Sequence, residues 1–332
     1  MPAPTRPASL FACNTLTRIG RRLLLWVVLS AVLCATGVGA SHAHAAEVTP
    51  LAVTEVASGV FVHNGVEQDA SPANDDEIAN IGFIVGGKMV AVIDPGGSFL
   101  EGERLRAAIR RRSALPIRYV IMTHVHPDHI FGAAAFRGDR PDFVGHAKLP
   151  GALAQRGDYY LRRLRETLGP EAEGSAVVAP SLLVASELDI DLGGRRLRVK
   201  AHGPAHTDND LTVFDDKTRT FWLADLLFVD RIPVVDGSLV GWLKELALVT
   251  AIAADRAVPG HGPVSVAWPA AAAPERRYLE TLAHDTRAAI KAGVGIAAAA
   301  QQIGQSERGR WLLFDDYNAR NATASYKELE WE

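Results

Sequence analysis

Cysteine is nearly absent from this 332-residue chain, which contains only Cys13 and Cys34. Both lie within the first 45 residues, so the chain from residue 46 onward has no thiol. This excludes disulfide bonds and thiolate metal ligands from that part of the sequence. Any metal site there must use nitrogen and oxygen donors.

A strong excess of charge is also absent, because 35 lysine and arginine residues face 38 aspartate and glutamate residues. A mildly acidic chain without basic clusters is a poor nucleic-acid binder, so we expect no nucleic-acid partner. Internal repeats are lacking as well. The apolar run Leu23–Leu33 is shorter than the roughly 20 residues that span a bilayer. We therefore expect no stable membrane anchor in the mature protein.

The first 45 residues have the pattern of a targeting segment. Arginines precede the apolar run, no acidic residue occurs before Glu47, and Ala43-His44-Ala45 is an A-x-A cleavage site. We predict a cleaved signal peptide over residues 1–45 and a periplasmic location. Arg21-Arg22 leaves both Sec and twin-arginine export open. Residues 46–332 are expected to form one large domain with a helical C-terminal segment.

The most informative segment runs from Thr123 to His129 and holds four metal-binding side chains: His124, His126, Asp128 and His129. It follows an apolar stretch that predicts a strand over residues 117–122. In extended backbone, alternate side chains share a face, so His124 and His126 can converge on one point. Pro127 turns the chain, which lets Asp128 and His129 aim at a second point. Imidazole and carboxylate suit zinc, iron or manganese. The pattern predicts a metal-dependent hydrolase.

Three further candidate ligands occur downstream: His206 in a loop, Asp225 at the end of a predicted strand over residues 221–224, and His261 between two glycines. Each alone has an ordinary explanation as a surface, turn or capping residue. Their order and context, together with the first motif, indicate a shared metal site.

Strands and helices alternate along the chain, and several strands are joined by tight turns. We predict a hairpin over residues 81–93, helices over 101–112, 149–168 and 239–254, and a mainly helical chain from residue 274. The tight turns favour an α+β fold with mixed, helix-covered sheets over a purely parallel sheet.

From about Val53 to His261 the chain resembles the metallo-β-lactamase superfamily. The family pattern H-x-H-x-D-H stands here as the first motif, and the later ligands match His206, Asp225 and His261. The resemblance implies a four-layered αβ/βα sandwich with the metal site at one edge, between two sheets. It implies one metal held by His124, His126 and His206, and a second held by Asp128, His129 and His261. Asp225 would bridge both, and Asp94 would support the metal-binding loop.

The resemblance also implies a reaction. Two Zn²⁺ ions, or iron or manganese, would hold a hydroxide that attacks an ester, thioester, lactone or amide carbonyl of a small-molecule substrate. Asp128 would orient the nucleophile or pass a proton to the leaving group. Some β-lactamases have cysteine where this chain has Asp225, and a bridging aspartate is more similar to glyoxalase II and lactonases.

Within the superfamily, four segments resemble the quinoprotein relay system zinc metallohydrolases, which are related to the SoxH group: residues 80–86, 123–129, 205–211 and 310–314. This implies a periplasmic role beside a pyrroloquinoline-quinone (PQQ)-dependent dehydrogenase or a cytochrome c. Two other hypotheses remain open: a mononuclear iron dioxygenase of a sulfur compound, and a non-enzymatic metal-binding partner of a quinoprotein. Metal identity and stoichiometry separate the hydrolase from the dioxygenase.

The sequence does not determine which residues line the pocket. Arg231 and Trp242 follow Asp225 closely, and Tyr159 and Tyr160 lie on the predicted helix over residues 149–168. Segments that follow a ligand strand often wall a pocket. Arg231 could hold a substrate carboxylate and the two tyrosines could cap the pocket, but we expect a surface position for Arg231, with its stem over the core, and packing roles for the tyrosines.

Overall fold

The computed structural model describes residues 48–332, which form one compact unit. The predicted signal peptide over residues 1–45 lies outside the described residues.

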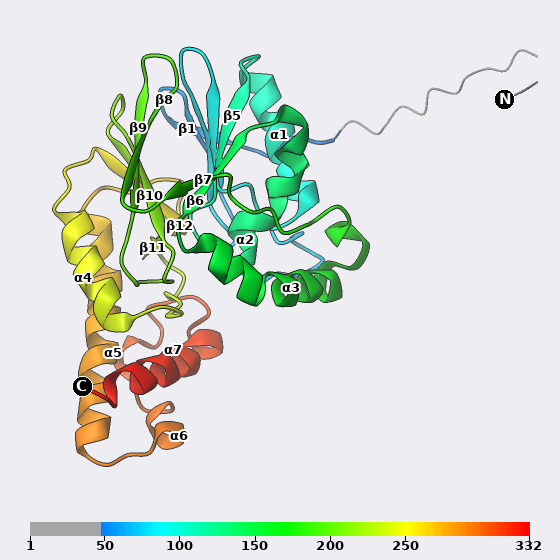
Figure 1. Ribbon diagram of the computed structural model, residues 1–332. Helices are drawn as coiled ribbons and strands as arrows, with labels where there is room; N and C mark the ends of the chain where they lie inside the picture. The colour runs from blue at the N-terminus through cyan, green and yellow to red at the C-terminus, as the bar shows by residue number, and fades with distance from the viewer. Residues whose placement is uncertain (1–47) are drawn as a thin grey trace, which may run out of the picture. The chain divides into compact units, whose positions relative to one another are not determined.

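The first sheet is mixed and has seven strands that lie in chain order (Figure 1). Neighbours from β1 to β4 are antiparallel, and neighbours from β4 to β7 are parallel. The predicted hairpin is β3 and β4, joined across Gly86-Gly87. The strands are β1 (Thr54–Ala57), β2 (Val60–His63), β3 (Ile81–Val85), β4 (Val90–Ile93), β5 (Ile117–Ile121), β6 (Asp142–His146) and β7 (Leu182–Val184).

The second sheet is also mixed and has five strands in the order β12-β11-β10-β9-β8. Only the β11–β12 pair is parallel. Its strands are β8 (Glu187–Asp191), β9 (Arg196–Ala201), β10 (Leu211–Asp215), β11 (Thr220–Phe228) and β12 (Arg256–His261).

The helices largely follow the sequence predictions, and α3 has the predicted bounds. The predicted helix over residues 239–254 is too long, because α4 ends at Thr250. Beyond it, the carbonyl of Ile252 accepts from Trp268 Nε1, and the backbone amide of Asp255 donates to the Arg219 carbonyl, which leads the chain into β12. Within residues 48–332, no helix combines the length and apolar character needed to cross a membrane. The helices are α1 (Phe99–Arg112), α2 (Pro127–Ile130), α3 (Leu149–Leu168), α4 (Leu239–Thr250), α5 (Ala273–Lys291), α6 (Ile296–Ala299) and α7 (Phe314–Leu329), with 3₁₀ turns between some of them.

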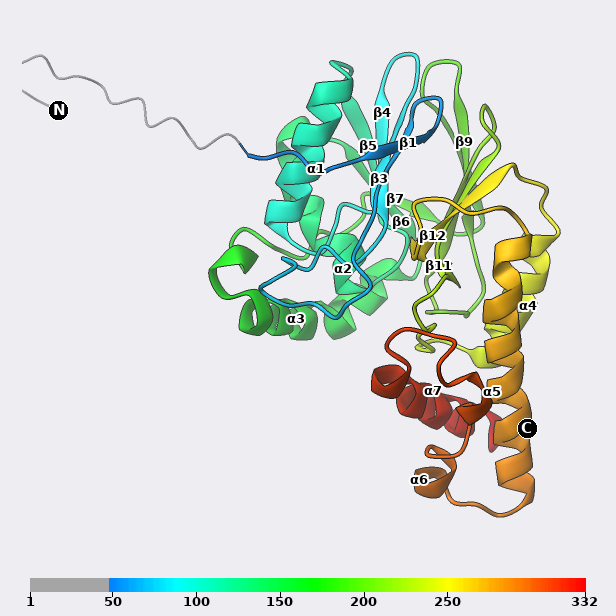
Figure 2. The same ribbon diagram turned by 180° about the vertical axis from the view of Figure 1, so that it is seen from behind.

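The layers are helix, sheet, sheet, helix. One buried apolar cluster joins the facing sides of the two sheets and includes Val60 and Val144 from the first and Val213 and Trp222 from the second. Two further clusters pack α1 and α3 against the outer side of the first sheet, and the largest covers the second sheet with α4, α5 and α7. Seen from behind, α1 and α3 lie on one side of the sheets and α4 and α5 on the other (Figure 2). The predicted four-layered α+β sandwich is confirmed.

A buried arginine joins the two sheets. Arg195 lies between β8 and β9, is 3% exposed, and pairs with Asp215 of β10 at 2.7 and 2.9 Å. Its Nη1 also donates to the carbonyl oxygens of Ser58 and Val85, which belong to the first sheet and its turn. One guanidinium therefore binds backbone of one sheet and a carboxylate of the other.

Candidate metal centre

The seven predicted ligands come from both sheets and meet at one edge of the sandwich. His124 and His126 follow β5, and Asp128 and His129 lie on α2. The others come from the β9–β10 turn (His206), from β11 (Asp225) and from the end of β12 (His261). The donor atoms form two groups, and within each group all of them lie within 4.8 Å of one another. The groups are His124, His126, His206 and Asp225, and Asp128, His129 and His261.

Asp225 lies between the two groups. Its carboxylate oxygens are 3.4 Å from Nε2 of His206, 3.1 Å from Nε2 of His129 and 3.5 Å from Nε2 of His261. This is the position that a bridging ligand would need.

The predicted end of the strand before Asp225 is wrong: β11 does not end at residue 224 but continues to Phe228. Ala224 adopts a left-handed φ of 50°, and the pairing with β12 is irregular on both sides of it. This break turns Asp225 toward the histidines within a continuing strand. Gly260 on β12 leaves the space that the carboxylate occupies, since a Cβ there would lie 1.7 Å from Asp225 Oδ1.

Four of the five histidines form a hydrogen bond through Nδ1, which leaves Nε2 available to bind a metal. The Nδ1 of His206 donates to the Val234 carbonyl and that of His261 to the Ile78 carbonyl, both at 2.8 Å. The other two are held through Thr123 and Asp94, as described next.

The buried Asp94, directly after β4, contacts the loop that carries His124 and His129. Its carboxylate accepts from His129 Nδ1 at 2.9 Å and from both the amide and the hydroxyl of Thr123. The Thr123 hydroxyl is in turn 3.0 Å from His124 Nδ1. One buried carboxylate thus orients two of the histidines.

The donor atoms fit a cation. Within residues 48–332, the buried atoms His124 Nε2, His129 Nε2 and Asp225 Oδ1 form no hydrogen bond of normal geometry, although the last two lie 3.1 Å apart. An unsatisfied buried polar atom costs about 1–3 kcal/mol, so three at one point need an explanation. Imidazole nitrogens and carboxylate oxygens without thiolates suit a divalent ion such as zinc. We conclude that these residues form a divalent metal site.

Burial and mutual proximity set the protonation states. Burial lowers the pKa of His124 and, together with His126, lowers that of His206 to about 3 despite the attraction of Asp225. Both imidazoles are therefore neutral, which is the metal-binding form. Burial opposes the charge on Asp225, but His129 and His261 outweigh it and hold the carboxylate pKa well below its usual range.

A cavity of about 180 Å³ opens directly on the centre and is lined by five of the ligands. Its remaining wall includes Tyr160, Tyr317, Arg231 and Arg320. The expected surface position of Arg231 is wrong: the residue is 4% exposed, and its Nη1 donates to the Gln68 carbonyl at 3.1 Å.

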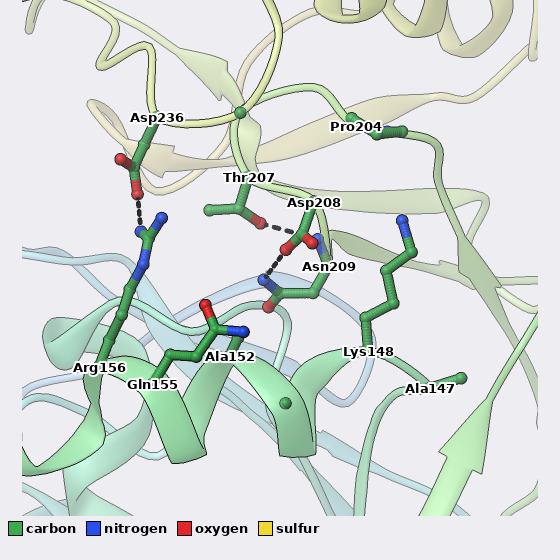
Figure 3. A pocket seen from close by; sticks show the side chains of 12 residues that line it. Ala147, Lys148, Ala152, Gln155, Arg156, Pro204, Thr207, Asp208, Asn209 and Asp236 are labelled. Carbon is green, nitrogen blue, oxygen red and sulfur yellow. Dashed lines mark hydrogen bonds and ion pairs between the residues drawn. The ribbon is translucent and has the colours of Figure 1, made fainter.

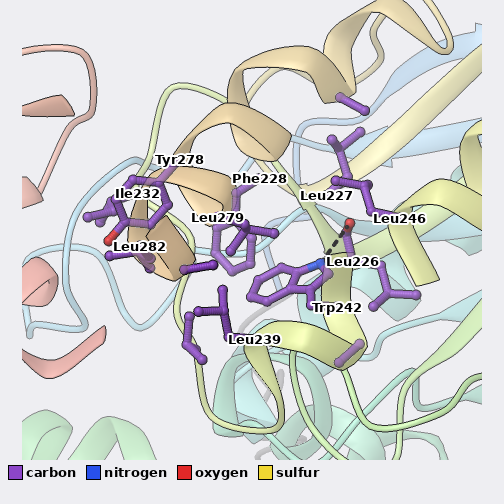
Figure 4. Close-up of a cluster of buried hydrophobic side chains, with 14 of the residues drawn as sticks. Leu226, Leu227, Phe228, Ile232, Leu239, Trp242, Leu246, Tyr278, Leu279 and Leu282 are labelled. Atoms are coloured by element: carbon purple, nitrogen blue, oxygen red, sulfur yellow. Dashed lines mark hydrogen bonds between the residues drawn. The ribbon is translucent and has the colours of Figure 1, made fainter. Parts of the chain in front are cut away.

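The expected packing role is met by one of the two tyrosines. Tyr160 packs against the apolar cluster that includes α3 and also lines the cavity, whereas the packing role expected for Tyr159 is wrong, since this residue is 53% exposed. Trp242 is buried in the cluster between β11, α4 and α5 (Figure 4). That cluster packs against the metal centre. The ring centroids of Phe228 and His261, which stack, are 5.0 Å apart, and those of Trp242 and His206, which meet edge-on, are 5.4 Å apart.

A second cavity of about 510 Å³ lies beside the first, between the start of α3 and the loop that carries His206. Asp236 and Arg156 form an ion pair on its wall (Figure 3). Asp236 also contacts His126, a role that was not predicted from the sequence. The dipeptide Asp236-Gly237 has the composition of an ordinary turn, so no sequence signal marked it.

Residues 74–261 match the family model described as the metallo-beta-lactamase superfamily. The linear primary-alkylsulfatase of Pseudomonas sp. (strain ATCC 19151) is 27% identical over 210 residues, which are 52% of this chain. The matched region spans only 40% of the length of that relative.

Solved structures show the same fold. A metallo-beta-lactamase from Pontibacter korlensis aligns with a TM-score of 0.57 at 18% identity, covering 69% of this chain and 99% of its own. The sec-alkylsulfatase Pisa1 from Pseudomonas sp. aligns with a TM-score of 0.64 at 15% identity, covering 84% and 50%. The mono-zinc form of FIM-1 from Pseudomonas aeruginosa has a TM-score of 0.55 at 18% identity, covering 70% and 96%. The match over residues 74–261 shows that this chain belongs to the metallo-β-lactamase superfamily, and the donor set lies at the sheet edge.

Proposed function

We propose that the protein is a binuclear zinc hydrolase that cleaves a small ester, thioester or lactone. The observation that carries this proposal is the position of Asp225 between two groups of donors, each large enough to hold one ion. When two zinc ions are bound, they supply a water molecule activated near neutral pH and polarise the substrate oxygen.

Asp128 is the candidate catalytic residue among the ligands. Its Oδ2 is 3.4 Å from His261 Nε2 and 3.5 Å from His129 Nε2, and its side chain lines the cavity. One carboxylate oxygen can therefore face the metal group while the other faces substrate. In that position it would orient the attacking water or carry a proton to the leaving group.

The cavity wall favours a substrate with a negative charge. Arg231 and Arg320 both line it, and Tyr160 and Tyr317 provide flat surfaces beside them. Guanidinium groups pair well with carboxylate and sulfate oxygens. A sulfate ester is therefore a second candidate substrate, favoured by these arginines and by the name of the alkylsulfatase relative.

The first test is the metal content of purified protein that begins at Ala46, measured by elemental mass spectrometry. We expect about two zinc ions per chain, and fewer in Asp225→Ala but not in a control with Asp208→Asn, which changes an exposed carboxylate outside the ligand groups. About one iron per chain would instead favour the mononuclear dioxygenase. Little bound metal after incubation with excess zinc would overturn the ligand assignment.

The second test is turnover. Chromogenic carboxylate esters, thioesters, lactones and alkyl sulfates are compared at equal concentration, with Asp225→Ala as the inactive reference. Hydrolysis of the first three classes supports the carbonyl mechanism. Hydrolysis of alkyl sulfates alone would replace it with the sulfate ester. No turnover with two zinc ions bound would favour the non-enzymatic metal-binding role.

We also propose periplasmic export and association with a PQQ-dependent dehydrogenase or cytochrome c. The support is the pattern of residues 1–45 and the four segments that resemble the quinoprotein relay group. N-terminal sequencing of the fractionated protein tests the first point, with Ala46 as the expected first residue. Cross-linking to the purified dehydrogenase or cytochrome tests the second.

A further inference from the structure

His126 is oriented differently from the other four histidines of the centre. Its Nδ1 faces the donor group, 2.8 Å from His206 Nε2, and its Nε2 faces Asp236 Oδ2 at 3.0 Å. The carboxylate accepts a hydrogen bond from Nε2–H and so leaves the Nδ1 lone pair free toward the metal position.

Asp236 is itself held from several directions. Arg156 of α3 pairs with the same oxygen that accepts from His126, and Arg320 of α7 lies 3.7 Å from the other oxygen. Its backbone amide donates to the His206 carbonyl at 3.1 Å. Figure 3 shows the carboxylate pointing at the Arg156 guanidinium on the wall of the second cavity.

The segment that carries Asp236 is fastened to the loop that carries His206. The backbone amide of Ser238 donates to the Ala205 carbonyl at 2.8 Å, and the Val234 carbonyl accepts from His206 Nδ1. Gly237 lies so close that a Cβ there would be 2.5 Å from the Ala205 carbonyl oxygen. Residues 234–238 therefore set the orientation of both His126 and His206.

We propose that Asp236 is a positioning residue for the metal group formed by His124, His126, His206 and Asp225. It selects the His126 tautomer that presents Nδ1, and Arg156 holds the carboxylate in place. This inference rests on the proposed function, since it needs an ion in that group. The second group has its own supports, Asp94 and the Ile78 carbonyl, and is independent of Asp236.

The test is a titration of metal-free protein with Co²⁺ alone, followed by visible spectroscopy and by counting bound ions. We expect Asp236→Ala to weaken one of two Co²⁺ sites about 10–100-fold and to change its spectrum, with the other site unchanged. Asp236→Asn keeps an acceptor oxygen for Nε2–H, so a smaller loss is expected. The control is Asp208→Asn, an exposed carboxylate beside the same loop whose side chain contacts Asn209 rather than a histidine.

Each outcome separates the two hypotheses. Wild-type protein that binds fewer than two Co²⁺ ions would overturn the binuclear function itself. Wild-type protein with two sites, both unchanged in Asp236→Ala, would overturn only the positioning role. Equal weakening of both sites together with a lower melting temperature would also overturn it, because a merely structural residue would act on the whole fold. If Asp236→Ala does not fold, the smaller and site-selective loss in Asp236→Asn decides the question.

Discussion

Gly260 is the residue that gives Asp225 its place in the centre. A Cβ at this position would lie 1.7 Å from Asp225 Oδ1 and 2.5 Å from the Ala224 carbonyl carbon. The carbonyl carbon cannot move freely, because Ala224 holds the left-handed turn of β11, so the Asp225 carboxylate would have to move. The smallest possible side chain is therefore incompatible with the observed carboxylate position.

We predict that Gly260→Ala displaces Asp225 and lowers the zinc content to about one ion or fewer per chain, with a stability cost of about 1–3 kcal/mol. Elemental analysis and urea unfolding measure the two effects. Gly138→Ala is the matched control, since a Cβ there meets no atom within 4 Å. Full zinc occupancy in Gly260→Ala would show that Asp225 does not bridge.

A second prediction concerns Glu275 of α5, which is fully buried. Its Oε1 accepts from the Phe228 amide at 2.9 Å, and Oε2 has no partner within residues 48–332. Burial raises the pKa of this carboxyl well above its usual value. The folded state therefore binds a proton that the unfolded state releases above a pKa of about 4.3, so stability falls as pH rises from there toward the folded pKa.

Glu275→Gln removes that proton equilibrium. We predict that its unfolding free energy exceeds that of the wild type by an amount that grows between pH 5 and pH 8, as measured by urea unfolding. The exposed Glu280→Gln on the same helix should not change the pH dependence. A constant difference across this range would mean that Glu275 is ionised in the folded protein.

Single residues show clearly what the sequence could and could not predict. The motif from His124 to His129 and the isolated His206, Asp225 and His261 were expected to share one centre, and the structure brings all seven together. The shared centre was predictable because these residues lie at or just after the ends of predicted strands. Asp236 was missed because a buried partner of a histidine is defined by three-dimensional contact, and its local sequence is that of a turn.

At the scale of elements, α4 and α7 are joined through a shared cap. Ser238 caps α4 by accepting from the Gly241 amide at 2.9 Å. Glu328 of α7 accepts from the Ser238 hydroxyl and from the amides of Leu239 and Val240. A carboxylate at a helix N-terminus is also favoured by the helix dipole.

We predict that Glu328→Ala destabilises the protein by about 1–3 kcal/mol, because it leaves amides at the start of α4 without an acceptor. Ser238→Ala should cost about 1 kcal/mol, and the double variant should cost less than the sum, since the two caps interact. Urea unfolding measures all three. The exposed Glu330→Ala at the end of α7 is the control, and an equal loss there would contradict the capping role.

Helices and hairpins were predictable where local signals are strong, and less so where tertiary contacts decide. The helix over residues 149–168 begins beside Pro150 and ends at Gly169, which are standard boundary residues. The continuation of β11 past Asp225 was not predictable, because it depends on pairing with β12 around a break at Ala224. The end of α4 likewise depends on the contact of Ile252 with Trp268.

At the scale of the whole molecule, the two sheets are held by an apolar layer and by Arg195. We predict that Arg195→Met costs about 3–5 kcal/mol, because it leaves Asp215 buried without its cation. Arg195→Met with Asp215→Asn should recover part of that loss. The control, Arg196→Met, removes an exposed ion pair with Asp216 and should change little. A similar effect of both single variants in urea unfolding would contradict this account.

The donors of the metal centre come from both sheets and from residues as far apart as His124 and His261, so no half of the chain can assemble it. Metal uptake at the bridging position therefore follows the docking of the two sheets. A chain that crosses a membrane unfolded would acquire its ions only on the far side, whereas a chain translocated after folding would carry them across. If the chain is exported as proposed, the route of translocation would decide which pool of metal ions fills the centre.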